Sequence, residues 1–115
     1  MCQDAQQSFV IVAIITLHRD SMDIFREYET KAAVLMARYG GAIERTVTEE
    51  PSETQSAVRE VHIITFPSRE AFGRYRADPE LEQHAHARAT AVAHTQLIFG
   101  TDGPHYMALS KATDV

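Results

Sequence analysis

The stretch VREVHIITFPSREAFGRYRADPELEQHAHARATAVAH, residues 58–94, decides the fold of this chain. Residues 58–66 are rich in β-branched side chains and are apolar on both alternating faces, which predicts a strand covered on both sides. Pro67 cannot donate a hydrogen bond to a sheet and Ser68 is a favourable N-cap, so a helix is expected to begin there. Asp78 and Pro79 interrupt this helix and restart it, because the residue before a proline avoids helical backbone angles.

The second part of this helix is predicted to lie close to a sheet. Small and apolar residues recur in it at helical spacing, and they are Leu81, Ala85, Arg88, Ala89 and Val92.

The residues before this stretch repeat the order of strand and helix. Residues 9–17 (FVIVAIITL) are β-branched and almost wholly apolar, as expected of a central strand. Asp20 or Ser21 is expected to cap the following helix, with Asp20 and Asp23 at the spacing of a capping box. On a helical wheel the buried face of that helix consists of Ile24, Phe25, Tyr28, Ala32, Leu35, Met36 and Tyr39. A glycine pair, residues 40–41, ends the helix.

Two more strands complete the pattern. Residues 42–49 (AIERTVTE) alternate like an edge strand, and the polar residues 50–57 that follow are expected to form a mobile loop. Residues 95–99 (TQLIF) read as a short last strand ended by Gly100. The predicted order is β-α-β-β-α-β, an α+β ferredoxin-like fold with both helices on one face of a four-stranded antiparallel sheet. We treat residues 1–100 as one domain and residues 101–115 as a tail, which is either disordered or docks residues 106–109 on a partner.

The other face of the predicted sheet is also apolar along its first and third strands. A monomer would leave this face in water, so we expect a homodimer that forms through the open sheet face.

Composition narrows the class of protein. The 115 residues fit one domain, and 11 basic against 16 acidic residues give a net charge of −5 without a basic run, which argues against nucleic-acid partners. The single cysteine, Cys2, offers no disulfide framework and favours a reducing cytoplasm. Residues 9–17 are too short to span a bilayer and do not resemble an export signal, so we expect no membrane association.

Two motifs carry a resemblance to a known family. MARYGGAIER, followed by a strand that ends in FPSREAFGRYRADPEL, resembles the dimeric α/β-barrel superfamily. The resemblance is strongest to a small bacterial family of unknown function with the pattern KYGG…EFPS-x-E-A…SPEY, and it covers residues 9–100. It implies that two ferredoxin-like protomers pack sheet to sheet as a dimeric α/β barrel. Thr65 departs from the family pattern, in which an acidic residue is common, so any chemistry of that carboxylate is missing here.

Relatives in this superfamily include cofactor-free monooxygenases, haem-degrading enzymes, polyketide cyclases and isomerases, so the resemblance implies a fold and no single reaction. The first two branches typically rely on Asn and Trp beside a His or Arg, and this chain contains neither Asn nor Trp. The plant-type cyclase pattern Tyr-x-x-x-Pro-x-His is similar at Tyr75 and Pro79, but Leu81 replaces the histidine. His84, one helical turn further on, is the candidate to take its place.

His62 is the strongest candidate for chemistry. It shares strand parity with Ile64 and Phe66, so we expect it to be buried. A buried neutral imidazole needs a partner, and the pKa of an imidazole is easily moved through neutrality, which is what a general base requires. Glu60 has the same parity and can orient it. The alternative is a structural histidine that is satisfied by a hydroxyl or a carbonyl.

Other candidates come from the two helices. Tyr28 and Tyr75 lie on buried helix faces, either as core residues or as proton donors. Arg88 either holds a carboxylate or enolate or covers the apolar stripe with its alkyl chain. We expect no metal, because His84 and His86 project from different sides of their helix.

Two functions remain open. The first is an enzyme without a cofactor, a cyclase or isomerase and less readily a monooxygenase, that moves a proton on a small apolar or aromatic substrate. Its catalytic residues would be His62, Tyr75 and His84, and its substrate-binding residues Tyr28, Arg88 and Glu60. The second is a non-catalytic dimeric module that binds a small molecule or a partner. An RNA-recognition domain is disfavoured because the strand VREVHIITF lacks exposed aromatic residues before its end.

Overall fold

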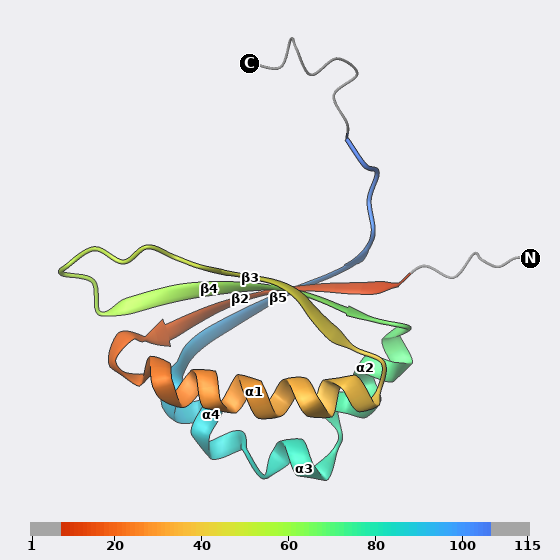
Figure 1. Cartoon of the computed structure of the whole chain (residues 1–115), viewed down its shortest axis with the longest axis horizontal. Coiled ribbons are helices and arrows are strands. Elements are labelled where there is room, and N and C mark those ends of the chain that lie inside the picture. Colours follow the sequence, from red (N-terminus) through yellow and green to blue (C-terminus); the bar gives the residue numbers. More distant parts are fainter. Residues whose placement is uncertain (1–7, 107–115) are drawn as a thin grey trace, which may run out of the picture.

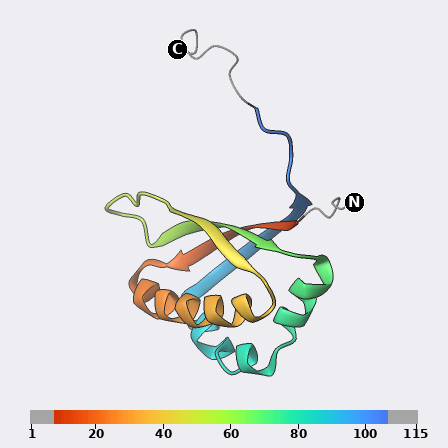
Figure 2. The same ribbon diagram turned by 45° about the vertical axis from the view of Figure 1, so that its right-hand side comes forward.

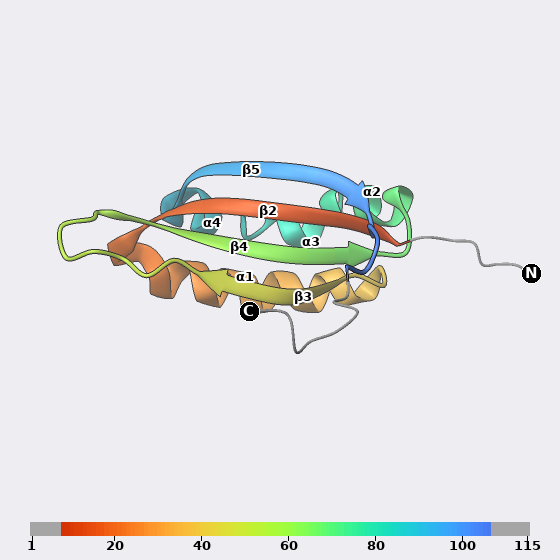
Figure 3. The ribbon, with the colours of Figure 1, turned by 90° about the horizontal axis from the view of Figure 1, so that it is seen from above.

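A single four-stranded antiparallel sheet forms one layer of the molecule, and every helix lies on one side of it (Figures 1 and 3). The computed structural model describes residues 8–106. In chain order the elements are β2 (Phe9–His18), a 3-10 turn η1 (Arg19–Ser21), α1 (Met22–Arg38), β3 (Ala42–Thr48), β4 (Ala57–Phe66), α2 (Arg69–Arg76), α3 (Pro79–Glu82), α4 (Ala85–Ala91) and β5 (Val92–Thr101). The strand order is β3-β4-β2-β5 with all neighbours antiparallel, which confirms the predicted ferredoxin-like fold.

The two central strands, β2 and β4, each present one buried face to the helices. Along β2 buried and half-buried residues alternate from Phe9 to Leu17, and the alternation along β4 has the same period. Ala13 pairs with His62, so both side chains project toward the helix layer. The sequence argument therefore correctly put His62, Ile64 and Phe66 on one buried face of β4, and the structure shows that this face meets the helices.

The core between sheet and helices is built from the stripe that the helical wheel predicted on α1. Phe25 is completely buried, and Tyr28, Ala32, Leu35 and Met36 are nearly so. Ile24 was wrongly assigned to this stripe, because it lies beyond its edge with 40% of its surface exposed. The predicted capping box is also wrong, since the turn η1 leads directly into α1 and Ser21 makes no side-chain cap hydrogen bond.

The glycine pair after α1 lets the chain pass close to the end of β4. Gly40 has a φ of +79°, a left-handed conformation that favours glycine. A Cβ atom on Gly41 would overlap the ring of Phe66 and contact Met36. This close approach fixes the position of the turn that connects α1 to β3.

The helical segment after β4 is broken twice, and the sequence predicted only the first break. Ser68 Oγ accepts a hydrogen bond from the Ala71 backbone N–H at 3.1 Å, as predicted for the N-cap of α2. Asp78 Oδ1 accepts one from the Glu80 backbone N–H at 2.7 Å and starts α3. A second break follows α3, and α4 begins only at Ala85.

The last strand is longer than predicted and takes up Val92, which the sequence analysis assigned to the helix. Val92 has an extended backbone, with φ −104° and ψ 121°, and pairs with Leu17 beyond an irregularity in the β2–β5 ladder. A β-branched residue suits that position. The strand β5 ends at Thr101, one residue after the predicted domain boundary.

Two polar contacts tie the end of α1 to the start of α3. Tyr39 donates from its hydroxyl to Asp78 Oδ2 at 2.6 Å, and Arg38 Nη1 lies 2.7 Å from Glu80 Oε1. The hydrogen bond from Tyr39 lowers the pKa of Asp78 and raises the pKa of Tyr39. These contacts hold the short helix α3 over the sheet.

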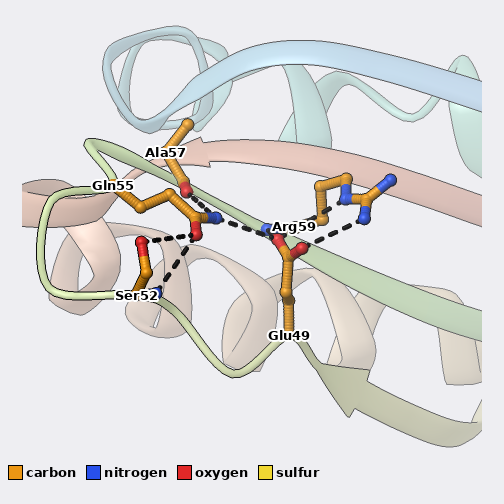
Figure 4. Close-up of polar contacts among 5 residues, drawn as sticks. All are labelled: Glu49, Ser52, Gln55, Ala57 and Arg59. Atoms are coloured by element: carbon orange, nitrogen blue, oxygen red, sulfur yellow. Dashed lines mark hydrogen bonds and ion pairs between the residues drawn. The ribbon is translucent and has the colours of Figure 1, made fainter.

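The β3–β4 loop, predicted to be mobile, extends beyond the helix layer and carries a polar network at its base (Figures 2 and 4). Gln55 Nε2 donates to the Ala57 carbonyl at 2.7 Å and to Glu49 Oε1 at 3.3 Å. Gln55 Oε1 accepts from the backbone N–H of Ser52 at 3.1 Å. Glu49 also accepts from the backbone and guanidinium of Arg59, which lowers the pKa of its carboxyl. The loop therefore begins and ends at a network of hydrogen bonds.

The sheet face away from the helices is apolar along its two central strands. Val12 and Ile14 of β2 lie on it beside Val61 and Ile63 of β4, and all four are half-buried. On the outer strands, Val47 is 50% exposed and Ile98 is 49% exposed on the same face. No helix among residues 8–106 is long and apolar enough to cross a membrane.

The predicted tail begins with residues 102–106, of which Tyr106 is 91% exposed. Residues 107–109 of the predicted docking segment lie outside the described residues, as does Cys2.

Candidate functional site

A cavity of about 550 Å³ lies between the sheet and the helices. Its sheet side is apolar and consists of Ile11, Ala13, Ile15, Ile64 and Leu97, together with His62 and Thr95. Its helix side consists of Tyr28, Glu29 and Met36 from α1, Phe72, Tyr75 and Arg76 from α2, and Leu81, Glu82, Ala85, Arg88 and Ala89 from the segment that follows. A pocket of this size that combines an apolar surface with several polar and charged groups suits a small molecule.

His62 reaches the cavity from the middle of β4 and is held by Glu60 on the same strand. The side chain of His62 is 3% exposed, and its Nε2 atom lies 2.9 Å from Glu60 Oε1. Because a carboxylate only accepts hydrogen bonds, we assign the proton of this contact to Nε2. In the neutral imidazole the lone pair is then on Nδ1, on the opposite side of the ring.

Glu60 lies behind His62 and does not line the cavity. Its carboxylate is 3% exposed, and its Oε2 atom accepts from Arg26 Nη2 at 3.1 Å and from Thr48 Oγ1 at 2.8 Å. A buried carboxylate is tolerated when it is paired and hydrogen-bonded in this way. The partner predicted for His62 is therefore in place, and Arg26 and Thr48 fix that partner in turn.

Glu29 faces the other nitrogen of His62, and the sequence analysis missed it. Glu29 Oε1 lies 4.0 Å from His62 Nδ1, and the carboxyl lines the cavity. Burial raises its pKa, and the neighbouring imidazole acts against that effect. A signal for Glu29 was present in the sequence, because the residue is four positions after Phe25 and three before Ala32, which are both buried.

Both predicted tyrosines line the cavity. Tyr28 is 7% exposed and Tyr75 is 6% exposed, and burial raises the pKa of each phenol. Arg88 lies beside them and lowers the pKa of Tyr28, against the larger effect of burial. Arg88 Nη2 donates to Thr95 Oγ1 at 2.9 Å, which fixes the guanidinium at the cavity wall.

His84 does not line the cavity. It is the residue before α4, where its backbone accepts a hydrogen bond from the Arg88 N–H. The structure thus brings together His62, Tyr28, Tyr75 and Arg88 from the predicted set, keeps Glu60 behind His62, and leaves His84 outside.

Thr65, where the chain departs from the family pattern, lies on the other side of the sheet. It alternates with His62 and Ile64 along β4, and its hydroxyl donates to Glu44 Oε2 at 2.9 Å. The departure therefore does not alter the cavity.

A metal site would need several ligands close together. Among the residues described, no group of three or more His, Cys, Asp or Glu side chains is arranged to hold a metal ion.

Residues 10–101 match a family model described as a domain of unknown function, DUF1330. This chain belongs to the DUF1330 family. The expected resemblance to a small family of unknown function is thereby confirmed. No curated protein sequence is significantly similar to the chain.

Solved structures share the fold of this DUF1330 protein at low sequence identity. The protein of unknown function RPA0582 from Rhodopseudomonas palustris is 18% identical, with a TM-score of 0.72 over 87% of this chain and 85% of that chain. A candidate antibiotic biosynthesis monooxygenase from Nitrosomonas europaea is 14% identical, with a TM-score of 0.65 over 89% and 94%. SnoaB, a cofactor-independent oxygenase from Streptomyces nogalater, is 16% identical in a mutant form, with a TM-score of 0.56 over 93% and 98%. At these identities the likeness concerns the fold alone.

Proposed function

We propose that this DUF1330 protein is an enzyme without a cofactor that moves a proton on a small apolar or aromatic substrate, as a cyclase or isomerase does. One observation carries the proposal. His62 is held by a buried carboxylate at 2.9 Å on one nitrogen, and its other nitrogen faces Glu29 at a cavity of about 550 Å³. An imidazole that is oriented by a second group and faces a pocket is the arrangement of a general base.

The proton transfer would begin at a C–H bond next to a carbonyl group of the substrate. This bond breaks, the proton goes to Nδ1 of His62, and the electron pair becomes the double bond of an enolate. Arg88 also lines the cavity and can hold a carboxylate or an enolate oxygen of the substrate. Return of the proton to another carbon completes an isomerisation. Attack of the enolate on a second carbonyl forms a C–C bond and an alkoxide, and return of the proton to that alkoxide completes a cyclisation.

Glu29 is suited to return the proton. Burial raises the pKa of its carboxyl, so more of it stays protonated near neutral pH than of an exposed glutamate. A carboxyl and an imidazole with different environments can divide the roles of acid and base.

An oxygenase reaction is less well supported. The fold is shared with SnoaB, but the sequence contains no Asn and no Trp, the residues on which the resembling oxygenases typically rely. The second candidate function is a non-catalytic binding module, which the same cavity would also serve.

We also propose that two copies form a homodimer through the open sheet face and that the protein works in the cytoplasm. The half-exposed side chains of Val47 and Ile98 and the apolar strands between them support the dimer, because a face of this kind is normally covered. The single cysteine of the chain fits a reducing compartment.

The experiment uses two neutral ketones, 2-tetralone and phenylacetone, in deuterated water. Proton NMR follows the exchange of the hydrogens next to the carbonyl. We expect the wild type to accelerate exchange and His62→Gln to lose roughly 100-fold or more of that rate. His86→Gln is the matched control, because His86 is exposed on α4 and outside the cavity. Binding of both ketones by calorimetry without exchange would instead support the non-catalytic module.

A further inference from the structure

The hydroxyl of Tyr75 has no hydrogen-bond partner among residues 8–106 although the residue is 6% exposed. Its ring is fixed by Phe66 and Phe72, with ring centroids 5.5 Å and 6.4 Å away. The residue lines the cavity. A buried hydroxyl without a partner is unfavourable, so its place in the wall is best explained by a polar group that enters the cavity.

Arg88 is a second group that lacks a counterpart. Within the described part of the chain its guanidinium makes no ion pair. It donates to Thr95 Oγ1 and lies close enough to the Tyr28 hydroxyl for a side-chain hydrogen bond that lowers the pKa of Tyr28, so further N–H donors of its five are left over. Arg88 lines the cavity together with the small residues Ala85 and Ala89. An arginine held in this way presents a fork of donors that fits a planar anion.

These two groups act at the same place. Burial is the main cause that raises the pKa of Tyr75, and Tyr28, Glu29 and Arg88 also influence it, which puts these side chains within range of one another's charges. Arg76 adds a second positive charge at the cavity, with its guanidinium 5.5 Å from the centre of the Phe72 ring. Glu29 lies 4.0 Å from His62 and also within range of the Arg88 charge, but burial raises the pKa of its carboxyl, so it opposes an incoming carboxylate less than an exposed glutamate would. Glu82 is exposed at the rim.

We infer that Arg88, Tyr75 and Tyr28 bind the carboxylate of a small aromatic acid. The guanidinium pairs with the carboxylate, and the Tyr75 hydroxyl donates the hydrogen bond that it lacks within the chain. The ring system lies on Ile11 and Leu97, next to Phe72. This inference deepens the proposed function, on which it rests for the choice of cavity, and it names the substrate class.

The geometry separates recognition from reaction. The anion site is formed by helix residues, whereas His62 projects from the sheet. A substrate held by its carboxylate at Arg88 therefore presents the other part of its body to His62. This makes an aromatic acid with an enolisable carbonyl beside the ring the fitting substrate.

The test is isothermal titration calorimetry with 2-naphthoate and its neutral isostere 2-naphthamide. We expect wild-type protein to bind 2-naphthoate at least about 10-fold more tightly than 2-naphthamide. Arg88→Gln should weaken naphthoate binding by about 10-fold or more and leave naphthamide binding nearly unchanged. Tyr75→Phe should weaken naphthoate binding about 3- to 10-fold, because it removes one hydroxyl and keeps the ring. Arg74→Gln, an exposed arginine outside the cavity, is the matched control and should bind as the wild type does.

Circular dichroism and thermal melting show that each variant is folded. Equal affinity for the acid and the amide, or an Arg88→Gln variant with undiminished naphthoate binding, would overturn the anion site. Its failure is distinguishable from failure of the proposed reaction, because naphthoate binding does not depend on turnover. If the protein binds naphthoate but does not accelerate exchange in the ketones, the anion site is supported and the proposed reaction is refuted. If it accelerates exchange but binds the acid and the amide equally, the proposed reaction is supported and the anion site is refuted.

Discussion

The Nε2 atom of His62 lies 2.9 Å from Oε1 of Glu60, and both side chains are 3% exposed. Two residues apart on one strand, they share a face, so the backbone of β4 itself sets their spacing. The pair lies under α1 and is closed on its outer side by Arg26 and Thr48. The sheet itself therefore sets the orientation of the imidazole, and no loop has to move to position it.

Removal of the Glu60 carboxylate should weaken the fold. In Glu60→Gln the amide keeps the shape but loses the charge that holds Arg26, and it cannot satisfy His62 and Thr48 as a carboxylate does. We expect a loss of about 1–3 kcal/mol in the free energy of unfolding, measured by urea denaturation. Glu27→Gln is the matched control, because Glu27 pairs with Lys31 at 3.6 Å on the surface of α1 and should change little. Similar losses in both variants would contradict this account of Glu60.

Glu29 should make the stability depend on pH. Its pKa is raised in the folded protein above the ordinary value of 4.5, so the folded state holds this proton more tightly than the unfolded state. The contribution of Glu29 to stability is thus fully present below about pH 4.5 and is lost as the pH rises through the folded pKa. Glu29→Gln should therefore gain stability relative to the wild type as the pH rises from 4.5 to 7.5, in urea denaturation at several pH values. A difference that stays constant or falls with pH would contradict the raised pKa.

Replacing Gly41 and Gly73 by alanine should change the stability of the protein in opposite directions. Gly41→Ala places a methyl group against the Phe66 ring, and we expect a loss of about 1–3 kcal/mol in the free energy of unfolding. Gly73→Ala meets no atom within 4 Å on α2, and alanine is the better helix former, so we expect a gain of about 0.5–1 kcal/mol. Urea denaturation at one fixed protein concentration compares the two. A Gly41→Ala variant as stable as the wild type would show that β4 can move away from the turn.

The open sheet face should control the oligomeric state. We expect the wild type to sediment as two chains at micromolar concentration, and Ile98→Glu to sediment as one, because it places a charge in the proposed interface. Val34→Glu is the control, since Val34 is 61% exposed on α1, on the other side of the molecule. A wild type that sediments as a single chain, or an Ile98→Glu variant that remains a dimer, would refute the proposed interface.

Much of the fold follows from patterns that are local in the sequence. The period of two along residues 58–66 was sufficient to place Glu60 and His62 on one face, and helical spacing placed Tyr28 on the buried side of α1. Capping residues that act within a few positions, Ser68 and Asp78, were also recognisable. These predictions were right because each depends on neighbours along the chain.

The features that were missed depend on partners distant in the sequence. Val92 becomes part of β5 because β2 offers it a pairing position, which no local pattern around residue 92 reveals. The spacing of Glu29 from Phe25 and Ala32 was a local signal, but a charged residue is normally expected on the solvent side of a helix, and only the distant His62 shows that its carboxyl faces the cavity. His84 was placed near the site on the assumption of one continuous helix, and the break before α4 turns it away.

One short run of the chain, residues 81–89, contributes five residues to the lining of the cavity, whereas His62 and Glu60 belong to the sheet. The five residues are Leu81, Glu82, Ala85, Arg88 and Ala89. Selection for a new ligand can therefore act on this run while the histidine and its carboxylate are retained. In a fold organised in this way, the helix side of the cavity can change during evolution while the sheet side is kept.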